Sequence, residues 1–263
     1  MSIRFENVSK SFGPPESRKT ILRDVSFEVQ TGEILFVLGK SGMGKSVTLK
    51  HIVGVLKPDS GRVLVDGTDV TRLDDLALAD IRRKCGMVFQ HPALLDSLSV
   101  FQNVSFGLRT PQYIRSIEKP LTEEQMEKLV LDKLKLVNLG SDVAERMPPE
   151  ISYGMQKRVS LARTLAPGPS YLLFDEPTTG LDPITTTAVN DLIFDLSRKL
   201  KVTSVVVSHD MACALKIADR ILVLDQARIL ALGTPSEMKR STEPLVRDFL
   251  AETLSLLPPE QRT

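Results

Sequence analysis

The chain has 263 residues, of which 42% are hydrophobic and 25% are charged, and its formal net charge is +1. A chain of this length can bury one sizeable core, or a core with a smaller lobe. The even charge balance argues against nucleic acid or an anionic membrane surface as the main partner. Cys85 and Cys213 lie far apart and form no CxxC unit, so neither a disulfide framework nor a zinc site is indicated.

The N-terminal segment carries charge from Arg4 onward and has no apolar core of a secretion signal. No stretch approaches the roughly 20 apolar residues that a membrane-spanning helix needs. We therefore expect a cytoplasmic chain that would serve a membrane by docking onto one.

The first predicted elements are strands. Apolar and polar residues alternate at 3–5 and again at 25–29, which predicts half-exposed strands. The run Ile34–Leu38 is apolar throughout, as expected for a strand that is buried on both faces. It leads into a glycine-rich loop, after which apolar residues at 47–56 predict a helix packed on one side.

A short strand and turn are predicted at 62–67, and a further strand within 81–89 that ends at Gln90. Residues 91–166 are mainly helical in pattern, and Thr122 with Gln125 forms a capping-box sequence before one of these helices. We expect this stretch to be a helical subdomain inserted between strands of the core.

Apolar strands return in the last third of the chain, at 171–174, 202–207, 221–224 and 229–232. Buried strands that alternate with helices are typical of an α/β fold with a mostly parallel sheet. We expect one domain over residues 1–250, with the helical subdomain at about 91–166, and a frayed C-terminal tail over 251–263.

The glycine-rich loop after the buried strand fits the P-loop pattern GxxxxGK[ST]. Its backbone N–H groups and the following helix N-terminus would face phosphate oxygens. Lys45 would reach the β- and γ-phosphates of ATP, and the Ser46 hydroxyl would ligate Mg²⁺. The residues expected to bind the nucleotide here are Gly39, Lys40, Ser41, Gly42, Met43, Gly44, Lys45, Ser46 and Val47.

Polar residues also follow other predicted strands. Asp175 and Glu176 close the strand at 171–174, where ligands of α/β sheets bind. Asp175 would hold Mg²⁺ and Glu176 would polarise the attacking water. His209 and Gln90 each follow a strand as well, so His209 would contact the γ-phosphate and Gln90 would reach Mg²⁺ and water. Taken alone, the two acids are equally well explained as strand caps, and His209 and Gln90 are better explained as structural side chains. Their joint placement at strand ends beside a P-loop favours the functional interpretation.

The ordered set of motifs resembles the ATP-binding cassette (ABC) family over almost the whole chain, from about Ile3 to Leu250. In that resemblance Phe12 stacks on adenine, residues 151–158 are the signature segment, and 180–182 are the D-loop. Residues 39–46 are the Walker A loop, Gln90 is the Q-loop glutamine, 173–176 are Walker B with the catalytic glutamate, and His209 is the switch histidine.

The resemblance implies a RecA-like P-loop core, a small N-terminal antiparallel β part and a helical subdomain. It also implies a head-to-tail dimer, in which ATP lies between Walker A of one copy and the signature segment of the second copy. Ser152, Gly154 and Asp182 would then contribute to the nucleotide site. Closure of the dimer would drive an integral-membrane permease, and hydrolysis would reset it.

One position departs from the family pattern LSGGQ, because Tyr153 replaces its first glycine. A ring at this point could crowd the opposing γ-phosphate, since glycine there allows close approach. Ser152 remains available as an N-cap or phosphate ligand. Asp182 before Pro183 is also a good N-cap pair, a structural role that can coexist with one in the site.

Finer resemblance points to the ATPases of Mla and Mce-type lipid transport systems. The similar stretches are residues 89–100, 44–47, Met155, 179–185 and 233–237. This implies phospholipid transport, a location on the cytoplasmic face of the inner membrane and a Mce-domain protein as a further candidate partner. Leu94, Leu95, Leu98 and Phe101, in the stretch that receives the permease in the family, are candidates for either docking or the core.

Three alternatives remain open at the level of sequence. The chain could power an importer for another solute, such as a polar amino acid. It could be a non-transport ABC protein, although such proteins usually carry two cassettes in one chain. It could also bind ATP with weak hydrolysis, and Tyr153 is the sequence reason to consider this.

Overall fold

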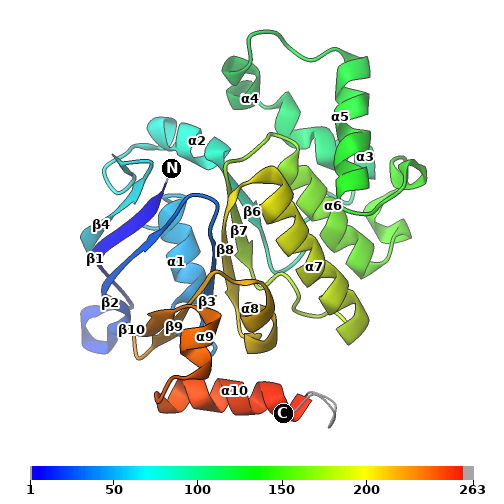
Figure 1. Ribbon diagram of the computed structural model, residues 1–263. Coiled ribbons are helices and arrows are strands. Elements are labelled where there is room, and N and C mark those ends of the chain that lie inside the picture. Colours follow the sequence, from blue (N-terminus) through cyan, green and yellow to red (C-terminus); the bar gives the residue numbers. More distant parts are fainter. Residues whose placement is uncertain (1, 257–263) are drawn as a thin grey trace. The chain divides into compact units, whose positions relative to one another are not determined.

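The structure, a computed structural model, describes residues 2–256 and divides into two units (Figure 1). Unit 1 comprises Met1–Leu73 and Thr203–Thr263, and unit 2 is the intervening segment Asp74–Val202. Within the described residues, no helix has the length and apolar character that crossing a bilayer requires. The part of the predicted tail after residue 256 lies outside the described residues.

An antiparallel sheet forms the N-terminal part of unit 1, with the strand order β2-β1-β4-β5 (Figure 1). The Phe5 and Phe27 rings, which are paired across β1 and β2, stack at 4.5 Å between centroids. These strands are β1 (Ile3–Phe12), β2 (Lys19–Val29), β4 (Ser60–Val65) and β5 (Thr68–Asp69). The predicted small antiparallel part is therefore present.

The second group of strands in unit 1 surrounds β3 (Ile34–Leu38), whose five residues are all buried. β3 pairs in parallel with β8 (Thr203–Ser208) on one side and β9 (Arg220–Asp225) on the other. β10 (Arg228–Gly233) then pairs antiparallel with β9. The helices of unit 1 are α1 (Lys45–Ile52), α8 (Met211–Ile217), α9 (Pro235–Lys239) and α10 (Pro244–Leu256). The tail predicted to be frayed from residue 251 is instead helical as far as Leu256, because α10 extends into it.

Unit 2 contains two parallel strands, β6 (Cys85–Val88) and β7 (Tyr171–Asp175), with helices before, between and after them in sequence. The helices are α2 (Asp75–Lys84), α3 (Val100–Ser105), α4 (Pro111–Ser116), α5 (Glu123–Leu136), α6 (Tyr153–Leu165) and α7 (Pro183–Leu200). The capping box predicted at Thr122 is formed, because its hydroxyl accepts from the Gln125 N–H and the Gln125 side chain accepts from the Thr122 N–H.

The helix predicted over 47–56 is wrong at its C-terminal end, because α1 stops at Ile52. The strand predicted within 81–89 is present as β6 (Cys85–Val88), and residues 81–84 before it form the last turn of α2. The Asp74 carboxylate starts this helix by accepting a hydrogen bond from the Ala77 N–H at 2.9 Å, which is a typical N-cap. The α/β class with a P-loop core, an antiparallel N-terminal part and inserted helices is otherwise confirmed.

Candidate functional site

The loop between β3 and α1 has a backbone that only glycine adopts readily. Gly42 and Gly44 have φ of 79° and 96°, in the left-handed region. A Cβ on Gly39 would lie 2.6 Å from the Leu224 carbonyl oxygen, and one on Gly44 would lie 2.9 Å from the Ile21 carbonyl oxygen. The loop is thus a tight backbone cradle that opens onto the N-terminus of an eight-residue helix, and such a cradle fits phosphate groups.

Lys45, the first residue of α1, folds back over this cradle. Its Nζ donates to the carbonyl oxygens of Gly39 at 2.8 Å and Lys40 at 3.3 Å, and the residue is buried. Ser46 and Val47 follow on the first turn of the helix and are half-buried. The lysine cation is therefore fixed next to the loop whose N–H groups would hold the phosphates.

Two other predicted site residues belong to the same unit. The β3–β8 register pairs Leu38 with Ser208, so Gly39 and His209 begin at the same edge of these strands. Asp210 then caps α8, since its side chain accepts from the Cys213 N–H at 2.9 Å. Phe12, at the end of β1, is 41% exposed. His209 is exposed too, so both rings are accessible to a ligand.

In unit 2, the β6–β7 register brings the second group of predicted residues together. Val88 pairs with Phe174, so Gln90 and the acids Asp175 and Glu176 leave the two strands at the same edge. Glu176 has φ of 50°, which is unusual for a residue with a side chain and costs of the order of 1 kcal/mol. Thr179 supports this turn, because its N–H donates to the Glu176 carbonyl oxygen at 3.3 Å.

The signature segment and the D-loop also meet within unit 2. The Ser152 hydroxyl caps α6 by accepting from the Met155 N–H at 3.3 Å, and a Cβ on Gly154 would lie 3.0 Å from Thr185 Cγ2. Asp182 caps α7, where its carboxylate accepts from the Ile184 and Thr185 N–H groups at 3.0 Å. The Thr185 hydroxyl, donating to the same carboxylate, holds the pKa of Asp182 below its ordinary value.

Tyr153 lies against residues of its own unit. Lys157 Nζ is 5.6 Å from the centre of its ring, and its hydroxyl is 3.3 Å from His91 Nδ1. A Cβ on Gly180 would lie 3.7 Å from the ring, so the D-loop also lies close to it. The ring remains 36% exposed.

The oxygen ligands present suit Mg²⁺ bound together with ATP. Among residues 2–256 there is no cluster of three or more His, Cys, Asp or Glu side chains that could hold a metal. Magnesium in nucleotide sites takes one or two protein oxygens together with phosphate oxygens. The predicted oxygen donors are the Ser46 hydroxyl in unit 1 and the Asp175 carboxylate in unit 2, and when bound the ion would neutralise charge on the phosphates.

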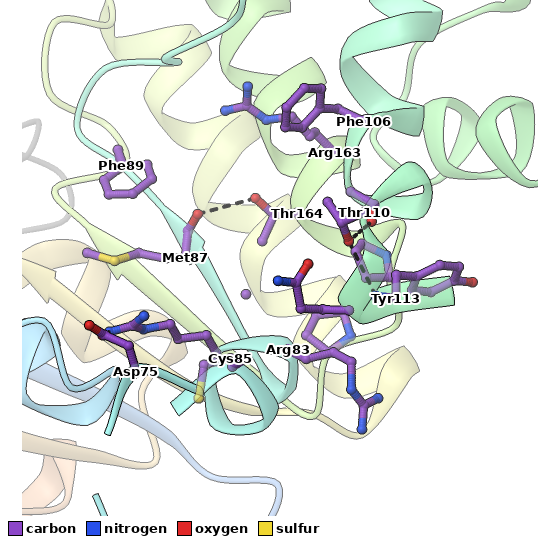
Figure 2. A pocket seen from close by; sticks show the side chains of 17 residues that line it. Asp75, Arg83, Cys85, Met87, Phe89, Phe106, Thr110, Tyr113, Arg163 and Thr164 are labelled. Carbon is purple, nitrogen blue, oxygen red and sulfur yellow. Dashed lines mark hydrogen bonds and ion pairs between the residues drawn. The ribbon is translucent and has the colours of Figure 1, made fainter. Parts of the chain in front are cut away.

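Sequence reasoning missed two features of unit 2. One is a pocket of about 480 Å³, shown in Figure 2, with the side chains of Phe89 and Phe106 among its lining residues. These rings are 45% and 50% exposed, whereas of the four apolar residues considered for docking only Leu95 is exposed. The signal for the pocket was weak, because large aromatic residues usually indicate core.

The second missed feature is Lys157 on α6, which is only 4% exposed. Its Nζ donates to the carbonyl oxygen of Gln90, in a short contact, and to that of Pro177 at 3.0 Å. Burial lowers the pKa of this lysine. No residue-type pattern could have shown these partners, since both acceptors are backbone atoms.

Comparison with known proteins agrees with these motifs. The family profile described as ABC transporter matches residues 22–179. The methionine import ATP-binding protein MetN of Carboxydothermus hydrogenoformans is 39% identical over 249 residues, which cover 94% of this chain and 71% of that protein. A probable ribonucleotide transport ATP-binding protein, Mkl of Mycobacterium leprae, is 37% identical over 95% of this chain and 69% of its own length.

A solved structure has the same fold. It is the dimeric, post-hydrolysis state of the ATP-binding cassette MJ0796 bound to ADP and Pi, with a TM-score of 0.79 and 32% sequence identity. The match covers 89% of this chain and 98% of that chain. The chain therefore belongs to the ABC transporter family, as an ATP-binding subunit that binds ATP with Mg²⁺ and hydrolyses it.

Proposed function

We propose that this chain powers phospholipid transport, as one of two ATPase subunits that bind ATP head to tail beneath an integral-membrane permease. The observation that carries the hydrolytic part is the grouping of the site residues at strand ends. Gly39 and His209 share one edge in unit 1, and Gln90 and Glu176 share one edge in unit 2.

Unit 1 would bind the nucleotide. The P-loop N–H groups and Lys45 hold the β- and γ-phosphates, as the positive-φ glycines and the folded-back lysine support. Phe12 is exposed and would stack on adenine. His209 would contact the γ-phosphate and so distinguish ATP from ADP.

Unit 2 would supply the hydrolytic residues. The Glu176 carboxylate accepts a proton from water as the water oxygen attacks the γ-phosphorus, and the bond from phosphorus to the ADP oxygen breaks. Asp175, Gln90 and Ser46 are the residues that would hold Mg²⁺, and the ion would neutralise negative charge on the phosphates. Ser152, Gly154 and Asp182 of a second copy complete the site, and the N-terminus of α6 there favours the negative charge of the phosphate.

The permease is proposed to dock on the pocket of unit 2. The rings of Phe89 and Phe106 offer apolar area to a short helix of the partner (Figure 2). Arg163, which also lines this pocket, donates to the carbonyl oxygens of Ala93 and Pro92 at 2.8 and 3.2 Å. Arg163 thereby holds the segment that directly follows Gln90. Docking of the permease at this pocket would then change the position of Gln90 and so affect hydrolysis. In this arrangement the chain is peripheral on the cytoplasmic face of the membrane.

Phospholipid is proposed as the cargo because residues 89–100 and the other stretches named above resemble lipid-transport ATPases. A Mce-domain protein would be a further partner, and nucleic acid would not, given the net charge of +1. A second candidate cargo is a polar amino acid, which the 39% identity to a methionine import ATP-binding protein favours.

Transport by the complex purified with its membrane partner tests the proposal. The complex is placed in vesicles that contain fluorescent phospholipid, and lipid transfer to unlabelled vesicles is followed with Mg-ATP. We expect ATP-driven lipid transfer by the wild type, and loss of both transfer and hydrolysis in Glu176→Gln, by about a hundredfold or more, while ATP still binds.

The outcomes separate the cargo from the site. ATP-driven uptake of labelled methionine without lipid transfer would show that the cargo is methionine and not phospholipid. The proposed roles of the site residues would be unaffected by this result. Undiminished hydrolysis by Glu176→Gln would contradict the role of Glu176.

A further inference from the structure

Lys157 is a buried cation whose polar partners are two backbone carbonyl oxygens. It projects from α6, one turn after the start of the helix, and is 4% exposed. No ion pair to a carboxylate is formed by this lysine in the part of the chain that the structure describes. Burial lowers its pKa, which expresses the free-energy cost of removing the ammonium group from water.

The two carbonyl groups belong to the segments that carry the proposed hydrolytic residues. One is the carbonyl of Gln90 itself, and the other is that of Pro177, the residue after Glu176. Glu176 has a left-handed backbone, a conformation that persists only where neighbouring contacts hold it. The hydrogen bond from Lys157 Nζ to the Pro177 carbonyl oxygen, at 3.0 Å, holds the backbone directly after Glu176.

The same lysine is linked to the start of the signature helix. Its Nζ lies 5.6 Å from the ring centre of Tyr153, one helical turn earlier, and the Tyr153 hydroxyl is 3.3 Å from His91. His91 directly follows Gln90 in the chain. Lys157 and Tyr153 therefore connect the first turn of α6 to the Gln90 loop at two points.

We infer that Lys157 is a positioning residue for ATP hydrolysis, which joins the signature helix, the Gln90 loop and the Glu176 loop so that they move as one. The inference rests on the hydrolytic roles proposed above for Gln90 and Glu176. Contact between the signature segment and the ATP of a second copy would then be transmitted to the hydrolytic residues within the same unit. A buried lysine costs stability, so its contribution here is the fixed position of these loops.

The test compares Lys157→Met, which keeps an unbranched apolar stem and removes the ammonium donors, with Lys157→Arg, which keeps donors. ATP affinity, KM, kcat and thermal unfolding are measured on the full chain in complex with its membrane partner. We expect Lys157→Met to lower kcat about tenfold or more with ATP affinity within about twofold of the wild type, because the P-loop lies in unit 1. Lys157→Arg should recover most of kcat.

Lys133→Met is the matched control. Lys133 lies on α5 of the same unit, and burial lowers its pKa as well, but it is outside both loops. We expect kcat of this variant to stay within about twofold of the wild type, as for changes away from a site. An equal loss of kcat in Lys133→Met and Lys157→Met would overturn the inference, and so would unchanged kcat in Lys157→Met.

If Lys157→Met does not fold, Lys157→Gln replaces it. The amide keeps one donor group on a shorter side chain, so kcat should be lower than in Lys157→Arg at equal ATP affinity. Equal kcat in these two variants would overturn the inference. If Glu176→Gln is inactive while Lys157→Met is fully active, only the role of Lys157 fails. If Glu176→Gln stays active, the proposed hydrolytic roles fail first.

Discussion

Tyr153 shows how a single side chain can depart from a family motif without a clash in its own chain. The ring packs beside Lys157 and Gly180, and its hydroxyl lies 3.3 Å from His91. It occupies the first turn of α6, where a side chain also favours the helical backbone over glycine. The tyrosine thus contributes contacts within unit 2.

We predict that Tyr153→Gly destabilises the chain. The loss combines a glycine in a helix with a lost cation–π contact, so the free energy of unfolding should fall by about 1–2 kcal/mol. Tyr153→Phe keeps the ring and should lose only about 0.5 kcal/mol, because the hydroxyl contact is exposed. Urea unfolding checks both values. A Tyr153→Gly chain as stable as the wild type would contradict the packing described for the ring.

Residue type and spacing were sufficient for one group of residues and not for another. The phosphate-binding loop was predictable because few sequences place glycines and a lysine at these intervals directly after a buried strand. Lys157 was not predictable, because its acceptors are the carbonyl groups of Gln90 and Pro177, which every residue possesses. The roles of Gln90, Asp175, Glu176 and His209 stay predictions until the variants are measured.

At the scale of elements, the P-loop depends on its neighbours as much as on its own sequence. β2 passes so close to the loop that a Cβ on Gly44 would meet the Ile21 carbonyl oxygen at 2.9 Å and the Leu22 side chain at the same distance. Gly67, in the turn between β4 and β5, has φ of 79° with nothing within 4 Å of its would-be Cβ. Both glycines have a left-handed backbone, but only Gly44 has other atoms close to the position of a Cβ.

We therefore predict that Gly44→Ala and Gly67→Ala have different effects. Gly67→Ala should lose about 1 kcal/mol of unfolding free energy, since alanine adopts the left-handed region poorly. Gly44→Ala should lose more, because its methyl group also meets the Ile21 carbonyl oxygen and the Leu22 side chain. Only Gly44→Ala should weaken ATP binding, because its methyl group displaces the phosphate-binding loop. A loss of about 1.4 kcal/mol of binding free energy lowers the affinity tenfold, so we expect a loss of about tenfold or more. Isothermal titration with an ATP analogue distinguishes them, and equal affinities in the two variants would show that the loop tolerates the methyl group.

The elements that sequence predicted best were those with a strong local signal. The apolar run of β3, the capping box at Thr122 and the N-cap at Asp182 all appear in the structure as expected. The start of the strand within 81–89 could not be placed from the sequence, because hydrophobic residues in a short window fit a strand and a helix equally. The Asp74 cap, together with the basic last turn of α2, was the signal that could have placed the boundary at Cys85.

At the scale of the molecule, function is proposed to require a second copy, since each nucleotide would contact the signature segment of its partner. ATP then acts as a ligand of the dimer, and bound ATP should favour association. We predict that Glu176→Gln, with hydrolysis blocked, elutes as a dimer with Mg-ATP and as a monomer without it. Light scattering after size-exclusion chromatography gives the mass directly. A monomer at all ATP concentrations would contradict the head-to-tail arrangement.

Unit 1 is built from both ends of the chain, and this has a consequence for synthesis on the ribosome. The hydrogen bonds around β3 join residues far apart in sequence: Gly32 N–H donates to Thr203 Oγ1 across 171 positions, and Ile34 N–H to Asp219 Oδ2 across 185. Pairings of such long range form slowly, and the unpaired apolar strand is exposed to aggregation until they do. During translation, β3 therefore has neither of its neighbouring strands until β8 (Thr203–Ser208) has been synthesised. A truncated transcript that ends before β8 would yield a product that cannot form its ATP site.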